Sequence, residues 1–175
     1  MRSVPKPLPD ADFLRSILDY SPETGIFTWI YRTDVHIGVN TRLAGVAAGR
    51  INGNGYITIG INGISYQAHR LAWRLMTGRD PASDIDHADC KKTNNSFANL
   101  RETTIYQNQA NTRKRITNTS GHKGVCWNKL RKKWMAQIKI DGKNTYIGLF
   151  DNIEAAAEAY KRAAIDRFGE FARTA

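Results

Sequence analysis

The sequence has little cysteine and no long hydrophobic run, and both absences exclude whole classes of protein. Its two cysteines, Cys90 and Cys126, have no second cysteine within metal-ligand spacing, which excludes a disulfide scaffold and a cysteine-rich zinc site. No apolar run approaches the length of a bilayer span, and the N-terminus lacks the hydrophobic region of a signal peptide. We therefore expect an unexported protein in a reducing interior, with no membrane partner.

Acidic residues are also few, at 16 against 26 Lys and Arg, so the 175-residue chain carries a net charge of +10. The charge is uneven, at +3 over residues 1–80, −1 over 81–112 and +8 over 113–175. Such an excess of basic residues indicates a polyanionic partner, with nucleic acid as the first candidate. The slightly acidic middle segment is the part of the chain that favours a bound cation. At 41% hydrophobic residues, the chain can also bury a core.

Hydrophobic periodicity and turn residues predict a first α+β segment over residues 1–112. Asn62-Gly63 predicts a type I′ hairpin turn, and Thr104 with Gln107 predicts the capped start of a helix. The remaining expected elements are a helix over 12–20, a strand over 25–30, a Gly-rich loop with a brief extended stretch over 32–52, hairpin strands over 55–61 and 64–69, a helix over 70–77 and extended segments over 84–87 and 99–103.

A second α+β segment is predicted over residues 121–175, after a polar linker over 113–120. Its alternating residues and the two-residue turn Asp141-Gly142 predict a three-stranded antiparallel sheet that is covered by one helix. The strands are expected over 124–127, 133–140 and 143–150, and the helix from Asp151 to a stop at Gly169.

The pair Asp86-His87 can carry chemistry, because an imidazole takes a proton from water near neutral pH and a carboxylate is a hard ligand for a divalent cation. Such a pair alone is more often an ordinary structural pair. An amide oxygen can ligate a cation or fix a histidine tautomer, so asparagines downstream strengthen the catalytic interpretation. Those asparagines are Asn95, Asn99, Asn108 and Asn111.

The run IDHADCKKTNNSFANLRETTIYQNQAN resembles the ββα-metal motif of HNH nucleases, in the cysteine-free branch of phage and intron homing endonucleases. The resemblance implies that His87 is the general base that activates the attacking water, and that Asp86 and Asn108 hold the metal. It also implies that Asn99 orients the His87 ring through a hydrogen bond, and that Asn95 braces the loop. The implied cofactor is Mg²⁺, with Mn²⁺ as a substitute.

The nuclease motif thus occupies residues 82–112 of the first segment. One carboxylate and one neutral amide supply a single negative charge, so the cation should bind weakly to the free protein. Its remaining ligands would come from water and from a DNA phosphate. Occupancy of the metal site is therefore expected to depend on the substrate.

The C-terminal segment resembles the Apetala-two/ethylene-response-factor DNA-binding domain, which reads the major groove of double-stranded DNA with a sheet. The markers are Gly124-Val125, Trp134-x-Ala136-x-Ile138 and Gly148-x-Phe150. By position, the resemblance implies DNA-facing side chains at Lys123, Asn128, Gln137, Lys139, Asn144 and Tyr146. The basic turn formed by Arg131, Lys132 and Lys133 is expected to contact phosphates.

The two resemblances together predict a metal-dependent DNA endonuclease of homing type, which in a phage setting would act in the cytoplasm of a bacterial host cell. One alternative is a non-catalytic DNA-binding regulator that retains the HNH fold. A second is an RNA-binding protein, although the A-form major groove is too narrow for a sheet. The sequence leaves open whether the chain is a monomer or a dimer, and whether it nicks DNA or cuts both strands.

Overall fold

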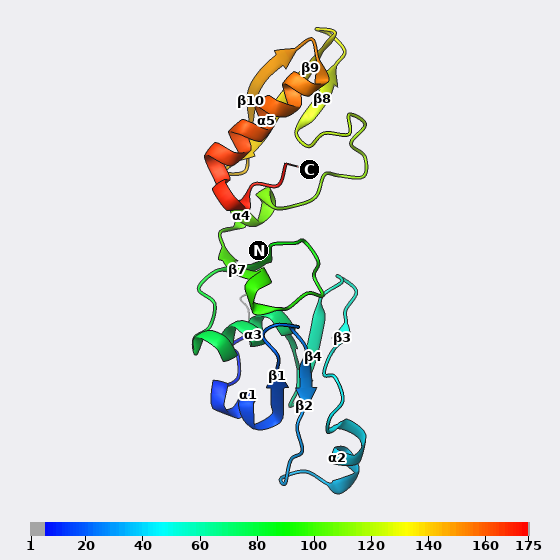
Figure 1. Cartoon of the computed structure of the whole chain (residues 1–175), viewed down its shortest axis with the longest axis vertical. Coiled ribbons are helices and arrows are strands. Elements are labelled where there is room, and N and C mark those ends of the chain that lie inside the picture. The colour runs from blue at the N-terminus through cyan, green and yellow to red at the C-terminus, as the bar shows by residue number, and fades with distance from the viewer. Residues whose placement is uncertain (1–5, 175) are drawn as a thin grey trace. The chain divides into compact units, whose positions relative to one another are not determined.

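The computed structural model describes residues 6–174 and confirms the predicted α+β class (Figure 1). The chain divides into two compact units between Glu102 and Thr103. This division lies ten residues before the predicted end of the first segment at residue 112. No helix of residues 6–174 is both long enough and apolar enough to span a bilayer.

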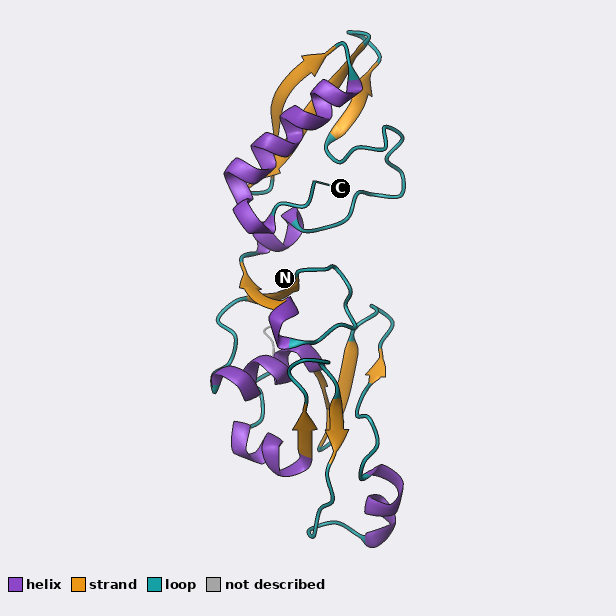
Figure 2. Ribbon diagram, viewed as in Figure 1, coloured by secondary structure: helices purple, strands orange, loops and turns teal. Residues whose placement is uncertain are grey.

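The first unit contains a three-stranded sheet, two two-stranded sheets and several short helices (Figure 2). The strand order in the larger sheet is β3-β4-β5, while β1 pairs with β2 and β6 pairs with β7. In chain order the elements are α1 (Ala11–Ile17), β1 (Leu18–Tyr20), β2 (Phe27–Trp29), α2 (Ile37–Leu43), β3 (Arg50–Ile51), β4 (Ile57–Ile61), β5 (Ile64–Gln67), α3 (Ala68–Thr77), β6 (Asp84–His87), the 3₁₀ turn η1 (Phe97–Asn99) and β7 (Leu100–Thr103).

The core of the first unit lies around α3, whose apolar side chains recur at helical spacing. Leu71 and Leu75 are buried there with Leu14 of α1, Ile59 of β4 and Ile85 of β6. Because Ile85 is fixed in this core, the adjacent residues of β6 have fixed positions as well. The core therefore supports the strand that carries the candidate catalytic pair.

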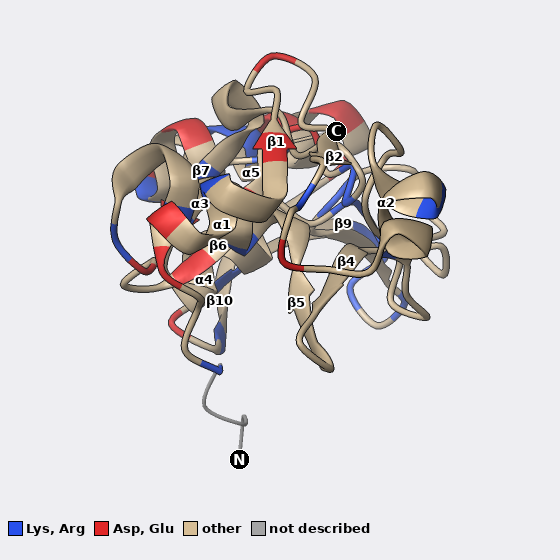
Figure 3. Cartoon of the chain, turned by 90° about the horizontal axis from the view of Figure 1, so that it is seen from below, with Lys and Arg blue, Asp and Glu red and all other residues tan. Residues whose placement is uncertain are grey.

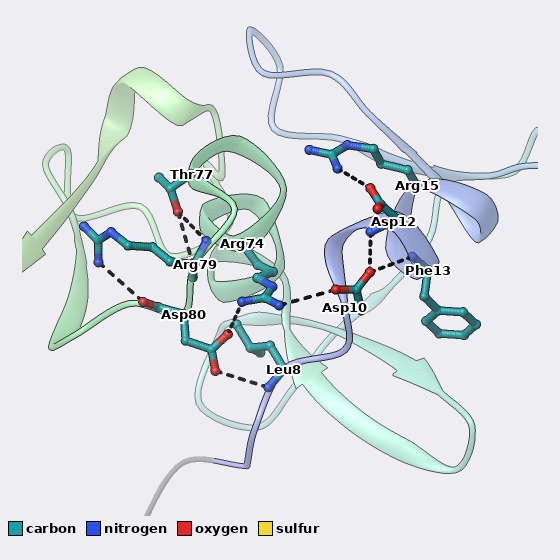
Figure 4. Close-up of polar contacts among 9 residues, drawn as sticks. All are labelled: Leu8, Asp10, Asp12, Phe13, Arg15, Arg74, Thr77, Arg79 and Asp80. Carbon is teal, nitrogen blue, oxygen red and sulfur yellow. Dashed lines mark hydrogen bonds and ion pairs between the residues drawn. The ribbon is translucent and has the colours of Figure 1, made fainter.

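Polar contacts fasten the start of α1 to α3 (Figure 4). The Asp10 carboxylate accepts from the backbone N–H of Asp12 at 2.8 Å, which is a helix N-cap. The same carboxylate lies 3.7 Å from the Arg74 guanidinium, which also lies 3.3 Å from Asp80. The backbone N–H of Leu8 donates to Asp80 at 3.4 Å, so the N-terminal segment is tied to the end of α3.

The predicted hairpin and the helix that follows it are confirmed. β4 and β5 pair through Asn62 and Gly63, which have φ angles of 50° and 75°, the left-handed conformations that a type I′ turn requires. The helix α3 ends at Gly78, whose φ of 72° allows the left-handed cap.

Two expectations for the first unit are wrong. The helix predicted over 12–20 ends at Ile17, because Leu18–Tyr20 pairs with Phe27–Trp29 as a strand. The stretch predicted as a loop contains α2, whose start is capped by the His36 imidazole accepting from the Gly38 N–H at 3.1 Å. In both cases the local sequence pattern is weak, and a contact outside that pattern, a strand pairing or a helix cap, sets the conformation.

The second unit is a three-stranded antiparallel sheet, order β10-β9-β8, with α5 across one face (Figure 1). Its core joins Val125, Ala136 and Ile138 of the sheet to Ala156 and Tyr160 of the helix. The helix cap is Asn152, one residue after the predicted Asp151. The elements are α4 (Ile105–Ala110), β8 (Val125–Asn128), β9 (Lys133–Ile140), β10 (Lys143–Phe150), α5 (Ile153–Phe168) and the 3₁₀ turn η2 (Gly169–Phe171).

The helix α4 belongs to this second unit, although it ends the predicted nuclease motif. The Lys123 ammonium donates to the carbonyls of Ala110 and Thr112 at 2.5 and 2.7 Å. The N–H of Arg173 also donates to the Ala110 carbonyl, at 3.4 Å. These bonds satisfy carbonyls at the open C-terminal end of α4, which explains why the division falls before the helix.

Candidate active site and nucleic-acid interface

Asp86 and His87 are the last two residues of β6, and both are buried, at 6% and 4% exposed. Adjacent residues on a strand point to opposite sides, and their partners differ accordingly. Asp86 contacts Arg101 of the neighbouring strand β7, whereas His87 contacts Asn95 and two aromatic rings. The structure thus gives the predicted metal ligand and the predicted base separate surroundings.

The His87 ring is held by a hydrogen bond and by packing. Its Nε2 lies 3.1 Å from Oδ1 of Asn95, and because an amide oxygen only accepts, Nε2 carries the hydrogen. In a neutral ring the lone pair is then on Nδ1. The rings of His69 and Tyr56 lie 5.0 and 5.9 Å from the His87 ring. Burial lowers the pKa of His87, which favours the neutral form that a general base needs.

The roles predicted for Asn95 and Asn99 are exchanged in the structure. Asn95 holds the imidazole, whereas the Asn99 amide donates to the Asp89 carboxylate at 3.0 Å and to the Asn94 carbonyl at 2.8 Å. Asn99 also accepts from the Asp89 N–H at 3.0 Å. Asn99 therefore braces the loop after β6, and the prediction that it orients His87 is corrected. The spacing of the two asparagines does not reveal which amide faces the ring.

Arg101 is a site residue that the sequence analysis missed. Its Nε and Nη2 lie 3.1 and 3.0 Å from Oδ2 of Asp86, a charge-assisted contact between two largely buried side chains. Arg101 lies on β7, the strand that pairs with β6. A basic residue two positions after Asn99, in the slightly acidic middle segment, was the available signal. The ion pair compensates part of the negative charge that a metal would require.

The donor atoms of Asp86 and Asn108 suit Mg²⁺, because carboxylate and amide oxygens are hard ligands. Asp86 is buried beside an arginine, and Asn108 lies on α4 after the confirmed Thr104–Gln107 capping box. Within residues 6–174, no group of three or more His, Cys, Asp and Glu side chains gathers as a metal site. Metal binding by Asp86 and Asn108 therefore stays a prediction.

His69 makes the stability of the first unit depend on pH. The side chain is 5% exposed, and its Nδ1 has no hydrogen-bond partner among the described residues. Burial lowers its pKa to about 3. Between pH 3 and 6.5, His69 is therefore protonated in the unfolded chain and neutral in the folded chain. We expect the free energy of unfolding to fall by up to about 1.4 kcal/mol per pH unit below pH 6.5.

The matched variant for this prediction is His69→Leu, which removes the titrating group. Denaturant unfolding at pH 7.5 and pH 5 should show a smaller loss for the variant than for the parent chain. Equal losses in the two proteins would show that His69 does not titrate as expected.

The uncovered face of the β8–β10 sheet carries most of the predicted DNA-binding residues. Cross-strand pairing sets Lys139 opposite Asn144, Gln137 opposite Tyr146, and Lys133 opposite Asn128. These residues alternate with the core residues that face α5. Figure 3 marks the basic and acidic positions of the chain. The structure thus brings six of the predicted contacts onto one face.

The remaining predicted contacts lie elsewhere. Arg131 and Lys132 are exposed in the turn between β8 and β9, where the Arg131 N–H donates to the Asn128 side chain at 3.0 Å. Lys123 is half-buried, and its ammonium binds the end of α4 as described above. The structure thus gives Lys123 a role in the fold of the second unit, and its predicted contact with DNA stays a prediction.

Comparison with known proteins finds two family matches along the chain, and the first of them extends past the division at Glu102 into α4. Residues 66–110 match the family described as HNH endonuclease, and residues 120–170 match the AP2 domain. Protein 3.8 of Escherichia phage T7 is 33% identical over 106 residues, which are 60% of this chain and 87% of that protein. An uncharacterized HNH endonuclease of Acanthamoeba polyphaga mimivirus is 33% identical over 108 residues, 61% of this chain and 55% of that protein.

A solved structure of the HNH homing endonuclease I-HmuI, described as binding and cleaving DNA, shares 20% identity and has a TM-score of 0.42. The match covers 91% of this chain and 90% of that chain. The family match, the phage relative and the viral relative carry the assignment. The chain belongs to the HNH endonuclease family and is a DNA-cleaving hydrolase with an AP2 domain after its nuclease motif.

Proposed function

We propose that the chain is a metal-dependent DNA endonuclease of homing type, which cuts double-stranded DNA at a site read partly by the β8–β10 sheet. The single observation that carries the proposal is the buried His87 ring, which Asn95 holds by a hydrogen bond at the position directly after Asp86 in the chain. A neutral imidazole with its tautomer fixed is what water activation requires. The phage relative supports action in the cytoplasm of a bacterial host cell.

In this proposal Nδ1 of His87 accepts a proton from the water that attacks the phosphodiester. Asn95 keeps the ring in the required tautomer and stabilises the imidazolium that forms. Asp86 and Asn108 would hold a divalent cation, Mg²⁺ or Mn²⁺. When bound, the cation supplies positive charge for the phosphodiester and for the leaving 3′ oxygen. Arg101 fixes the Asp86 carboxylate so that its oxygens keep their orientation.

Recognition is assigned to the uncovered sheet face, whose polar and basic side chains suit base edges and phosphates. The nine Lys and Arg residues between 113 and 140, with no acid among them, support this assignment. With roughly 6 to 10 phosphate contacts, affinity should fall by about 10³ to 10⁵ between 50 and 200 mM salt.

The variant Lys139→Ala tests the assignment of this face. Lys139 is exposed on the uncovered side of β9, so its loss should weaken binding to all duplexes. The slope of log affinity against log salt concentration should become smaller in magnitude by about one. Lys161→Ala is the matched control, because Lys161 lies exposed on α5, which covers the opposite face. Affinities measured by fluorescence anisotropy over a salt series give both slopes. Equal slopes for the two variants would contradict the assignment.

The proposal as a whole is tested by cleavage of a randomised duplex library in Mg²⁺, with sequencing of the new ends. Recurrent ends at one sequence, carrying 5′-phosphate and 3′-hydroxyl groups, are the expected result. Binding without any new ends would favour the alternative of a non-catalytic regulator. Preference for duplex RNA in a competition assay would favour the RNA-binding alternative.

A further inference from the structure

An apolar band crosses the uncovered face of the second unit's sheet. Cys126 of β8 lies opposite Met135 of β9, and Met135 lies opposite Leu149 of β10. The band therefore contains one residue from each strand, in register. All three side chains are half-buried, and within the described chain none of them belongs to the core that α5 covers.

Polar residues lie on both sides of this apolar band. Along β9, Lys133 precedes Met135, while Gln137 and Lys139 follow it on the same face. Each of these polar residues has a polar partner on the adjacent strand. The face thus reads polar, apolar, polar along the strands, and this pattern differs from the uniformly polar surface of a solvated sheet.

We propose that the band formed by Cys126, Met135 and Leu149 contacts the 5-methyl group of thymine, and so selects for thymine in the target site. The inference rests on the proposed function, in which this face binds DNA in the major groove. The charge of the surrounding segment indicates a nucleic acid as the occupant, since residues 113–140 contain nine basic side chains and no acid. The major groove of an RNA duplex is too narrow for a sheet, which favours DNA.

Each base presents a different set of groups in the major groove. Thymine offers a methyl group beside its O4 acceptor. Guanine offers two acceptors, adenine an acceptor and an amine donor, and cytosine an amine donor, and none of these three carries a methyl group. Against an apolar band, those polar groups would lose water without gaining a partner, which is unfavourable. The thymine methyl group loses nothing there and buries apolar surface. Selectivity would then arise at a position where the chain makes no side-chain hydrogen bond to a base.

The experiment removes the methyl group from the DNA. Duplexes that bind the full chain are selected from a randomised library in EDTA, which withholds metal during selection. The selected duplex is then prepared with deoxyuridine in place of thymidine, one position at a time. Deoxyuridine keeps the hydrogen-bonding groups of thymidine and lacks only the methyl. We expect about a fourfold loss of affinity at the positions under the band, the effect of one buried methyl group, and no change at the others.

The protein side of the test uses Met135→Ala with Lys139→Ala as the control. Met135→Ala should bind the thymidine and deoxyuridine duplexes with more nearly equal affinity. Lys139→Ala should weaken both duplexes and keep the difference between them. A thermal unfolding curve like that of the parent chain establishes that Met135→Ala is folded.

Three results are decisive. Selected duplexes with no recurrent thymine, or equal affinity for thymidine and deoxyuridine at every position, would overturn the inference while DNA binding stands. A difference that persists unchanged in folded Met135→Ala would also overturn it. Failure of every duplex to bind would instead overturn the proposed function of this face.

Discussion

Replacing His87 with alanine is expected to lower the rate of duplex DNA cleavage by about 10² to 10⁴, the contribution typical of a general base. The ring is buried, its tautomer is fixed by Asn95, and burial lowers its pKa, so it is held ready as a neutral acceptor. DNA affinity measured in EDTA should not change, since the proposed DNA-binding residues belong to the β8–β10 sheet and do not include His87. Single-turnover cleavage with saturating protein measures the chemical step separately from binding.

The matched control is His122→Ala, because His122 is an exposed histidine in the second unit. It should cleave at the parent rate. Thermal unfolding of His87→Ala distinguishes loss of chemistry from loss of fold. A folded His87→Ala protein that cleaves within tenfold of the parent rate would contradict the role of His87.

The second large effect is expected for Gly25→Ala, far from the reacting atoms in sequence. Gly25 has a φ of +73°, and a methyl group there would lie 2.8 Å from Asn95 Cα and overlap the adjoining backbone. Asn95 must then move, and Asn95 is the residue that holds His87. Steric strain and an unfavourable φ together should destabilise the first unit by about 2–5 kcal/mol, with a large loss of cleavage.

Other contacts explain why this loop cannot shift freely. The Tyr20 hydroxyl donates to the Asn95 carbonyl at 2.7 Å, and the Phe97 N–H donates to the Pro22 carbonyl at 2.8 Å. The β1–β2 hairpin is thus a support for the catalytic loop. Gly45→Ala is the control, since Gly45 has a φ of +79° but nothing described lies within 4 Å of an added methyl. Equal destabilisation of the two variants in denaturant unfolding would show that the close approach is unimportant.

Those parts of the fold that depend on local signals were predictable from the sequence. The turns at Asn62-Gly63 and Asp141-Gly142 adopt positive φ angles, and the two long strands of the second unit have the predicted bounds. The Thr104–Gln107 cap also forms as expected. Each of these features depends on residues that are neighbours in the chain, so the pattern alone was sufficient.

Features that depend on distant contacts were not predictable. Lys123 could be matched to a DNA-contact position, but the carbonyls that it binds belong to the end of α4. Asn95 and Asn99 are chemically identical, and only the path of the loop decides which of them faces His87. Arg101 requires the pairing of β6 with β7 to identify its partner. The sequence therefore indicated the chemistry of the site better than the individual partnerships within it.

The most direct test of the account is cleavage of a supercoiled plasmid that carries the selected duplex, in Mg²⁺ and in EDTA. The account predicts nicked or linear plasmid in Mg²⁺ and intact supercoiled plasmid in EDTA. Intact plasmid in Mg²⁺ under conditions where the chain binds it, or equal cleavage in EDTA, would contradict the claim of a metal-dependent endonuclease.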